Sequence, residues 1–306
     1  MTNDPSNRTS PLAIAVIGVG KIGSTFAYQL ARAGHHVTAV ARPGSKRLEQ
    51  LRMESAVVTN KGDRAPVSVA DALDEETPYD LIVVTTLAHQ VDALLPALRR
   101  SKSKSVLFMF NVFDPERLAI AVGTERAAFG MPMVVASLEP HGRLRPMIST
   151  RRKTLLGDRR WADLFESSGI PSIHELHMPD WLRSHVPVCV CLEAVSIAGK
   201  RRGSGATWAE AVTVARGFKA MYVAIRALGH PVIPRAKAAA SSSPAGVVAS
   251  MLWVASRISF VRNAMANGLD ECRSLVDDIL VASAASPSAV PATVVASIKR
   301  MMPHPN

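Results

Sequence analysis

The sequence predicts an α/β protein in which a doubly wound parallel sheet is followed by an all-helical C-terminal domain. Three observations carry this prediction. In the first half, short apolar runs alternate with helix-forming segments, which is the pattern of parallel strands joined by crossover helices. From Asp180 onward, the apolar segments are long and repeat at helical spacing. The length of 306 residues suits two domains of ordinary size, which we place at residues 1–175 and 176–306.

Apolar runs and the turn-forming residues between them assign the N-terminal elements. Strands are expected at Leu12–Ile17, His36–Ala41, Val67–Val69, Asp80–Thr86, Ser105–Phe110, Met133–Ser137, Leu144–Ser149 and Lys153–Leu156. Helices are expected at Ser24–Ala33, Leu48–Val58, Val91–Arg100 and Pro115–Phe129. The Leu-Ile-Val-Val core of the run Asp80–Thr86 is typical of a strand that a parallel sheet buries on both faces.

Long segments with helical periodicity assign the C-terminal half. Helices are expected at Trp181–Ala198, Thr207–Leu228, Ala245–Arg257 and Leu269–Ala282. The chain after Ala282 is rich in Ser, Pro and Ala, which predicts an irregular tail with one last helix before Met302.

The composition describes a folded chain with a basic surface. Hydrophobic residues make up 48% and charged residues 20%, which excludes a disordered protein. The formal net charge is +11, and short basic bursts such as Lys200-Arg201-Arg202 would attract small acidic substrates. The sequence has neither zinc-ligand spacing nor an RNP-like motif, and aromatic residues are only 5%. Nucleic acid is therefore not an expected partner.

Cysteine usage and the apolar runs indicate a compartment. The three cysteines, Cys189, Cys191 and Cys272, are predicted to be reduced and buried. The segment Met1–Pro11 lacks the basic and apolar regions of a signal peptide, and no run of ~18 uninterrupted apolar residues occurs. We expect a cytoplasmic protein without a membrane partner. The histidines show no metal-ligand spacing with Cys or carboxylates, so no metal site is expected.

The segment Gly18-Val19-Gly20-Lys21-Ile22-Gly23 directly follows the first strand and precedes the first helix. In this context, G-x-G-x-x-G is the dinucleotide-binding fingerprint of a Rossmann-type sheet. Gly18 permits a tight turn, Gly20 lets the backbone approach a diphosphate, and Gly23 lets helix and strand pack closely. We assign all six residues to cofactor binding; a glycine-rich turn without a ligand is the alternative.

The end of the second strand indicates which dinucleotide binds. NAD-preferring sites usually place an acidic residue there, where it holds the ribose 2′-hydroxyl. Here the strand ends in Arg42. A guanidinium can form paired hydrogen bonds to a 2′-phosphate, with Lys46 or Arg47 as helpers. This favours NADP(H) as the cofactor; a solvated loop arginine is the alternative.

Four features of the sequence together resemble the ketopantoate reductase family. They are the glycine-rich turn, the Ala-Arg that ends the second strand, an Asn after the fourth buried strand, and a helical second half that starts near a Trp. The resemblance covers nearly the whole chain. It implies that Asn111 lies near the nicotinamide, although the usual glycine after it is Val112 here. It also implies that Ser259 and Glu271, which have the family's twelve-residue spacing, contact substrate and cofactor. Substrate binding is assigned to Asn263 as well.

The sequence departs from the family pattern at two lysines. The family's catalytic lysine follows a Trp by two positions and precedes an Asn by four, but Trp181 is followed here by Arg183 and Pro187. A cofactor-binding lysine after the third strand is replaced by Leu87, which we keep as a cofactor-binding position. The expected proton donor is therefore missing.

Two residues are candidates for the missing donor. Hydride transfer to a ketone leaves an alkoxide that must be stabilised and protonated. Arg183 could stabilise the oxyanion but is a poor acid, whereas His185 could supply the proton. The two positions lie about 200° apart on a helix, so both cannot face one cleft unless the backbone is irregular before Pro187. Arg183 and His185 stay alternative catalytic residues beside Asn111 and Glu271, with surface exposure and a core histidine as the competing interpretations.

The sequence thus predicts an NADPH-dependent reductase, similar to ketopantoate reductase, that transfers hydride to the C=O of a small anionic 2-oxo acid. Reduction of an imine or of another carbonyl is the first alternative, because the family reaction depends on the lost lysines. A protein that binds NADP(H) without turnover, as a sensor or an interaction protein, is the second. A homodimer is a candidate assembly.

Overall fold

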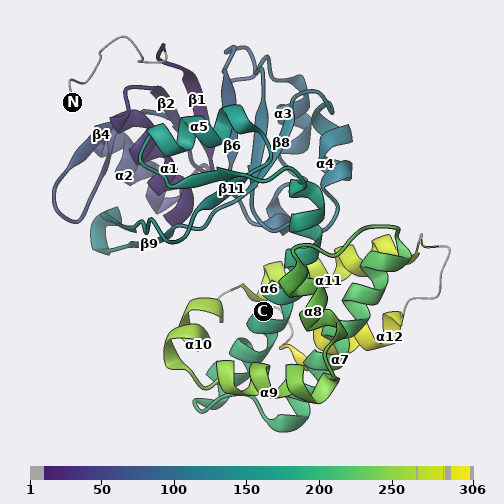
Figure 1. The fold of residues 1–306 in the computed structure, drawn as a ribbon. Helices are drawn as coiled ribbons and strands as arrows, with labels where there is room; N and C mark the ends of the chain where they lie inside the picture. Colours follow the sequence, from purple (N-terminus) through teal and green to yellow (C-terminus); the bar gives the residue numbers. More distant parts are fainter. Residues whose placement is uncertain (1–9, 267, 285, 287–290, 304–306) are drawn as a thin grey trace, which may run out of the picture. The chain divides into compact units, whose positions relative to one another are not determined.

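The computed structural model describes residues 10–266, 268–284, 286 and 291–303. Two compact units are distinguished (Figure 1). The sheet unit contains the chain up to Thr86 together with Val91–Phe110 and Leu118–Leu176. The helical unit contains Leu87–Gln90, Asn111–Arg117 and the chain from His177 onward. Two short segments of the first half of the chain are thus part of the helical unit.

An eight-stranded sheet forms the sheet unit, in the order β12-β11-β8-β7-β6-β1-β2-β5. Its strands are β1 (Ala13–Ile17), β2 (His36–Val40), β5 (Ser68–Ala70), β6 (Leu81–Val84), β7 (Val106–Met109), β8 (Ala127–Met131), β11 (Thr154–Leu156) and β12 (Ser172–His174). Neighbouring strands are parallel except β8 and β11, which are antiparallel. Two small antiparallel pairs also occur, β3 (Ala56–Val58) with β4 (Arg64–Pro66) and β9 (Val135–Leu138) with β10 (Leu144–Met147).

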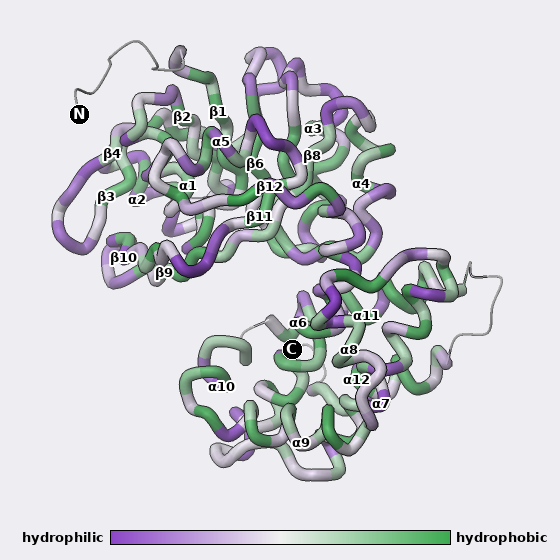
Figure 2. The backbone as a smooth tube through the Cα atoms, in the orientation of Figure 1, coloured by the Kyte–Doolittle hydropathy of each residue, from purple (hydrophilic) through white to green (hydrophobic). Residues whose placement is uncertain are grey.

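The central strands are buried on both faces, as their apolar sequences require. Every residue of β6 and β7 is buried. Figure 2 colours the neighbouring strand β1 as hydrophobic. In the register, Val16 of β1 lies between Ala39 of β2 and Val83 of β6. The strand order reverses at β1, because β2 and β5 lie on one side of it and β6, β7 and β8 on the other. In open parallel sheets, ligands bind at the carboxyl ends of the strands at such a reversal.

The helices of the N-terminal half connect these strands. They are α1 (Lys21–Arg32), α2 (Lys46–Glu54), α3 (Leu95–Arg100), α4 (Pro115–Val122) and α5 (Arg159–Ser167), with short 3-10 helices η2 (Ala88–Gln90) and η3 (Pro140–Gly142). Phe26 of α1 and Phe165 of α5 make an edge-to-face contact with ring centroids 5.1 Å apart. This contact lies in the core of the sheet unit.

Two predicted helices are too long. The helix expected at Leu48–Val58 ends at Glu54, because Ser55 takes a left-handed conformation (φ 47°) and the next residues form β3. The helix expected at Pro115–Phe129 ends at Val122, before Gly123 (φ 102°), and the chain then enters β8. In both places the helix ends next to a residue with a positive φ, and the residues that follow pair as a strand. Helix α5 and strand β12 were not predicted.

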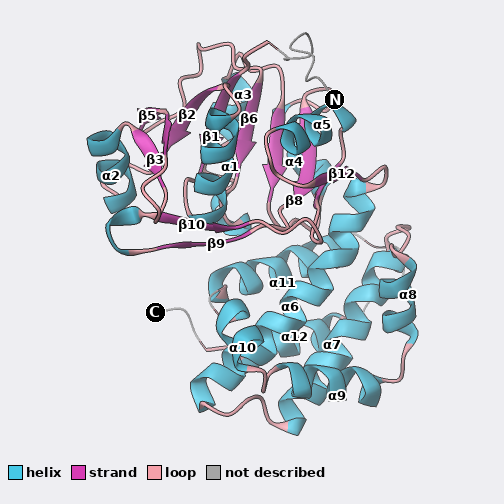
Figure 3. Ribbon diagram, turned by 60° about the vertical axis from the view of Figure 1, so that its left-hand side comes forward, coloured by secondary structure: helices cyan, strands magenta, loops and turns pink. Residues whose placement is uncertain are grey.

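The helical unit contains the remaining helices. They are α6 (Met178–Arg202), α7 (Trp208–Ala227), α8 (Arg235–Ser242), α9 (Ala245–Ala255), α10 (Ser259–Met265), α11 (Leu269–Ala284) and α12 (Ala292–Met301). In the part of the chain that the structure describes, every strand precedes α6 (Figure 3). The predicted fold class is therefore confirmed. Helices α8 and α10 are additions to the prediction, whereas the last helix before Met302 was expected.

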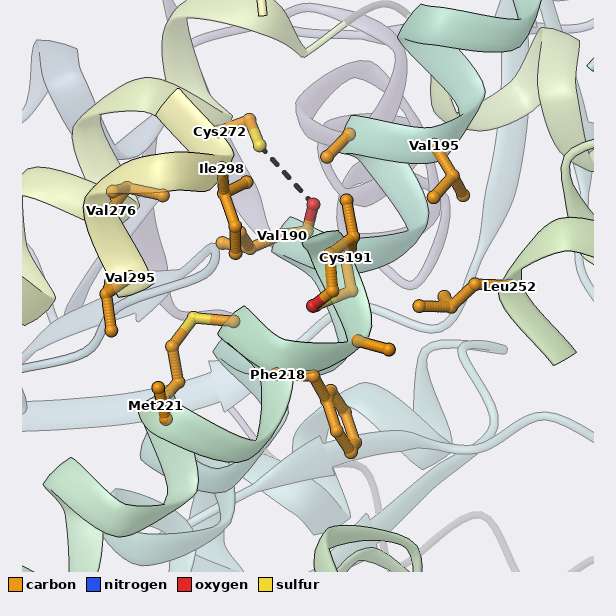
Figure 4. Packing of buried hydrophobic residues seen from close by; sticks show 14 of the residues in the cluster. Val190, Cys191, Val195, Phe218, Met221, Leu252, Cys272, Val276, Val295 and Ile298 are labelled. Carbon is orange, nitrogen blue, oxygen red and sulfur yellow. Dashed lines mark hydrogen bonds between the residues drawn. The ribbon is translucent and has the colours of Figure 1, made fainter. Parts of the chain in front are cut away.

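Helix α6 lies in the core of the helical unit and packs against α7, α10 and α11. Figure 4 shows Cys272 of α11 pointing toward the carbonyl oxygen of Val190 in α6, at 3.5 Å. The three cysteines are free and buried, as predicted. Within the described residues, α6 is apolar and long enough to cross a membrane, and α8 and α9 would also qualify if taken together. Because 83% of the apolar stretch of α6 is buried inside the protein, this is weak support for a membrane span.

Candidate active site

The glycine-rich turn joins β1 to α1 at the point where the strand order reverses. Gly18 has a φ of 89°, which side chains rarely adopt, and its N–H donates to Val40 O at 3.1 Å. A Cβ added to Gly23 would lie 2.4 Å from Gly18 O and from Thr85 Oγ1. Only glycine at these two positions therefore permits the turn and the close approach of α1 to β1.

The third glycine leaves open space in front of the helix. A Cβ on Gly20 would have Gly18 O, at 4.0 Å, as its nearest neighbour. Gly20 is the N-cap of α1, and neither a side-chain cap nor an acidic residue in the first turn offsets the positive end of the helix. Such a helix end is suited to a phosphate group. The turn therefore fits a dinucleotide diphosphate.

The predicted helper Arg47 contacts the turn, and each of its three guanidinium nitrogens donates a hydrogen bond. Its guanidinium donates to Val19 O (3.3 Å), Ser24 Oγ (2.9 Å) and Gly142 O (2.8 Å). Burial lowers the pKa of Arg47. These bonds make Arg47 a positioning residue for the turn and leave its fork unavailable to a 2′-phosphate.

Arg42 lies two residues beyond β2 and is exposed. Lys46, the first residue of α2, is exposed as well. Among the described residues, the guanidinium of Arg42 makes no hydrogen bond or ion pair. The exposed side chains of Arg42 and Lys46, near this strand end, can thus bind an anion.

The end of β6 faces the same turn. Thr85 Oγ1 donates to Gly18 O at 2.8 Å, and the Thr86 side chain would be 3.0 Å from a Cβ on Gly18. Thr86 Oγ1 is buried without a hydrogen-bond partner among the described residues. A buried hydroxyl in this state is suited to a polar ligand group. Leu87, the cofactor-binding position assigned from the family pattern, is 42% exposed and lies in the helical unit.

A polar face on the apolar helix α6 forms the second part of the candidate site. Trp181, His185, Cys189 and Glu193 recur every four residues and so lie on one side of the helix. The rings of Trp181 and His185 lie 4.6 Å apart. Asn111, which follows β7 in sequence, acts as a hydrogen-bond partner of Cys189.

Asn111 and Glu271 lie 160 positions apart in the chain and meet in the helical unit. The amide nitrogen of Asn111 donates to Glu271 Oε1 at 3.4 Å. The amide oxygen of Asn111 is buried without a hydrogen-bond partner in the described structure. Burial raises the pKa of Glu271, and the Asn111 hydrogen bond and the nearby His89 oppose this rise. The structure thus brings together two residues that the family resemblance selected.

Glu193 is a second buried carboxyl group beside Asn111 and Glu271, and it was not predicted; we call these side chains and the polar face of α6 the polar cluster. Its side chain is 8% exposed, and Oε2 has no hydrogen-bond partner among the described residues. Burial and the charge of Glu271 raise the pKa of Glu193 to about 8, against an opposing hydrogen bond with Cys272. Glu193 is therefore largely protonated at neutral pH and can donate a hydrogen bond.

Arg183 lies outside this face. It is 2% exposed, and its guanidinium forms ion pairs with Glu116 and with Asp180, the latter at 3.0 Å. Although burial acts to raise it, the hydrogen bond and charge of Arg183 hold the pKa of Glu116 below its ordinary value. Since α6 continues through Pro187, the predicted divergence of positions 183 and 185 is what the structure shows. The contacts of Arg183 are structural.

His185 lies on the polar face but is deprotonated there at neutral pH. Burial, together with the positive charge of Lys237, lowers its pKa to about 4. Its Nδ1 atom is buried without a hydrogen-bond partner among the described residues. At neutral pH the imidazole is therefore uncharged. It can hydrogen-bond a ligand, but it has no imidazolium proton to transfer.

The remaining predicted residues are not part of the observed cluster. Ser259 is the first residue of α10, and Asn263 lies one turn further on the same helix. Both side chains are exposed. Their substrate-binding role stays a prediction. Among the described residues no group of three or more His, Cys, Asp and Glu side chains is placed to hold a metal ion.

Glu193 and Lys237 are the charged residues that the sequence analysis missed. A carboxyl group at four-residue spacing from His185 and Cys189, inside an otherwise apolar helix, was the available signal for Glu193. Lys237 gave no comparable signal, because it lies in a short helix that was not predicted.

A Rossmann-type sheet whose glycine-rich turn suits a diphosphate, followed by a helical unit with a buried polar cluster, is the arrangement of a class of nucleotide-dependent enzymes. Residues 14–160, slightly less than half of the chain, match the model of the family described as "Ketopantoate reductase PanE/ApbA". The comparison with curated proteins gave no match. The family match supports an oxidoreductase that uses a nicotinamide cofactor.

Solved structures share the fold over nearly the whole chain. A PanE/ApbA family ketopantoate reductase from Ralstonia eutropha JMP134 is 17% identical, with a TM-score of 0.69 and coverage of 94% of this chain and 97% of that one. The 2-dehydropantoate 2-reductase from Methylococcus capsulatus is 19% identical, with a TM-score of 0.61 and coverage of 94% and 96%. D-mandelate dehydrogenase, solved with NADH and anilino(oxo)acetate, is 18% identical, with a TM-score of 0.66 and coverage of 94% and 96%.

Proposed function

We propose that this protein is an NADPH-dependent reductase that transfers hydride to the carbonyl carbon of a small 2-oxo acid. The observation that carries the proposal is the turn at Gly18–Gly23, with its open space at Gly20 and the exposed Arg42 beyond the neighbouring strand. The turn suits a diphosphate, and a guanidinium at the position of Arg42 suits a 2′-phosphate. The bound cofactor would supply the hydride.

The polar cluster of the helical unit supports the assignment of the substrate. Asn111 offers a buried amide oxygen without a partner, and Glu193 offers a carboxyl group that is protonated at neutral pH. An alkoxide that forms at the carbonyl oxygen needs a hydrogen-bond donor and a proton. In this proposal Glu193 and the neutral His185 are the donors, and Glu271 orients Asn111. The structure of D-mandelate dehydrogenase with anilino(oxo)acetate shows that this fold accepts an oxo acid analogue in another protein.

The contacts of Arg183 argue against its predicted catalytic role. Both sides of the guanidinium are held by the carboxylates of Glu116 and Asp180. A group in this arrangement would have to lose two ion pairs before it could reach a substrate. We therefore assign Arg183 to the positioning of α6.

Reduction of an imine is the second candidate function. The specific observation that favours it is the pair of buried carboxyl groups, Glu193 and Glu271, whose charges interact. A protonated imine is a cation, and a nearby carboxylate would stabilise it. A ketone substrate gains nothing from that charge, so the two substrates should differ in their dependence on Glu271.

Oxidation of NADPH, followed at its absorbance maximum, tests the proposal against panels of 2-oxo acids, neutral ketones and imines. We expect turnover with at least one 2-oxo acid. Turnover with imines alone would replace the first candidate by the second. Tight NADPH binding without turnover on any panel member would indicate a sensor or interaction protein and refute both enzymatic candidates.

The choice of cofactor is tested by Arg42→Ala. Removing the phosphate partner should weaken NADPH by about 10-fold to 100-fold, while the affinity for NADH changes less than about twofold. Lys61→Ala, which removes an exposed charge elsewhere in the sheet unit, is the matched control. Equal losses for NADPH and NADH in Arg42→Ala would contradict the assignment of NADP(H).

A further inference from the structure

Lys237 brings a positive charge to the polar face of α6 from another helix. It lies in α8 and is half-buried. Its Nζ atom donates to the carbonyl oxygen of Trp181 at 3.2 Å and lies 3.6 Å from the centroid of the Trp181 ring. The ammonium group is thus fixed over the first residue of the polar face by a hydrogen bond and a cation–π contact.

The segment that carries Lys237 is anchored to α6 and α7. The N–H of Ile233, just before α8, donates to Ser184 Oγ in α6 at 3.1 Å. After α8, the carbonyl oxygen of Ser243 accepts from Lys219 Nζ of α7 at 2.6 Å. Because hydrogen bonds hold both ends of α8, the fold sets the position of the Lys237 ammonium.

The polar face lies between the Lys237 ammonium at one end and the carboxyl groups of Glu193 and Glu271 at the other. The positive charge of Lys237 acts on His185 and on Cys189, whereas Glu193 and Glu271 act on Cys189 with the opposite sign. Cys189 therefore lies between a cation and a pair of carboxyl groups. A carboxylate ligand would be attracted to the end with Lys237, whereas at the other end the charge that raises the pKa of Glu193, that of Glu271, would repel it.

We propose that Lys237 binds the carboxylate of the substrate and so sets the preference of this site for 2-oxo acids. This inference rests on the proposed reductase function. Arg183, the basic residue nearest in sequence on α6, cannot take this role, since its guanidinium is paired with Glu116 and Asp180 on a different side of the helix. With the carboxylate on Lys237, the adjacent carbonyl group lies toward His185 and Cys189, one turn further along the helix.

The neutral imidazole of His185 fits this arrangement. A charged imidazolium beside Lys237 would cost electrostatic energy, whereas the neutral ring can donate one N–H to the carbonyl oxygen. The Lys237 ammonium stays protonated throughout and takes part in no covalent step. Its role is the binding and the orientation of an anionic substrate.

Paired substrates separate this role from a role in proton transfer. We would measure kcat and KM for each active 2-oxo acid and for its methyl ester, which keeps the carbonyl group but loses the charge. In Lys237→Met and Lys237→Gln, KM for the acid should rise about 100-fold, while the constants for the ester change less than about threefold. Lys237→Arg should restore part of the affinity. Arg235→Met, which removes an exposed charge from the same helix, should leave both substrates unaffected.

Two kinetic results would overturn the inference. An equal fall in kcat for acid and ester would place Lys237 at the reacting carbonyl, and unchanged constants would remove it from the site. If the wild-type protein reduces no carbonyl compound, the proposed function fails first. The inference is then judged by calorimetric titration of the NADPH-saturated protein with oxamate: binding that the Lys237 variants weaken supports it, and binding that they leave intact, or no binding at all, overturns it.

Discussion

Glu193→Gln should change how the stability of the protein depends on pH. The pKa of Glu193 is raised from 4.5 to about 8, first by burial and then by the charge of Glu271. The folded protein therefore holds a proton that the unfolded chain has already lost between these two pH values. The contribution of this group to stability is fully present below pH 4.5 and declines as the pH rises toward 8. Glutamine has the same shape and no charge, so the variant lacks this decline.

The size of the effect follows from the difference between the two pKa values. A change from 4.5 to about 8 corresponds to about 5 kcal/mol, and entry of water around the ionised carboxylate would make the measured value smaller. At pH 5 the variant and the wild type should differ by less than about 1 kcal/mol. At pH 9 Glu193→Gln should be more stable by about 2–5 kcal/mol.

Urea unfolding followed by circular dichroism at pH 5, 7 and 9 measures this difference. Glu125→Gln, which changes an exposed carboxyl group, is the control and should give the same small difference at every pH. A difference between Glu193→Gln and the wild type that does not grow from pH 5 to pH 9 would refute the reasoning, because Glu193 would then ionise in the folded protein as it does in water.

Three further predictions follow from the same contacts. Gly23→Ala should destabilise the protein by about 1–3 kcal/mol and weaken NADPH binding, because the new Cβ would lie 2.4 Å from Gly18 O. Gly246→Ala, which has open space around it, is the control and should change neither thermal unfolding nor NADPH titration. Equal effects of the two substitutions would contradict the packing argument. The wild type should lose about 3 kcal/mol of stability as the pH falls from 6.5 to about 4, because the pKa of His185 is lowered over that range, and His185→Gln should not show this loss. A wild type whose unfolding curve is the same at pH 7 and at pH 4.5 would disprove the prediction. Arg183→Met should lower the unfolding free energy by about 1–3 kcal/mol and kcat by less than about threefold, and a kcat loss near 100-fold at unchanged stability would restore its catalytic role.

The glycine-rich turn could be predicted from the sequence because its geometry is local. Gly18, Gly20 and Gly23 lie within six residues; the structure shows a steric reason for glycine at Gly18 and Gly23, and open space at Gly20. The strand before the turn and the helix after it were predicted from apolar periodicity. Arg42 was selected for the same reason, as the residue that follows a predicted strand end, and its role in cofactor binding stays a prediction.

The polar cluster depends on long-range packing and was predicted only in part. Asn111 and Glu271 were each selected from the family pattern, but their hydrogen bond was not predicted, because no local signal joins residues 160 positions apart. Glu193 had a helical spacing signal, but the ion pairs of Arg183 and the approach of Lys237 from α8 depend on tertiary contacts. The catalytic and binding roles of these residues stay predictions.

Strand pairing explains where the predicted helices were too long. The segments Ala56–Val58 and Ala127–Met131 have residues that either a helix or a strand accommodates. Their partners, β4 for the first and β7 for the second, decide between the two structures. Such partners are not visible in a local window of sequence.

The most direct test of the central claim is the affinity of Gly20→Asp for NADPH, measured by calorimetric titration beside the wild type. Gly20 is the N-cap of α1 in an extended conformation with open space around it, so aspartate should cap the helix and leave the thermal stability unchanged or raised. Its carboxylate would then take the place of the diphosphate at the helix end. We predict saturable binding of NADPH to the wild type and a loss of at least about 100-fold in the variant. Equal binding by both proteins, or no binding by the wild type, would contradict the account.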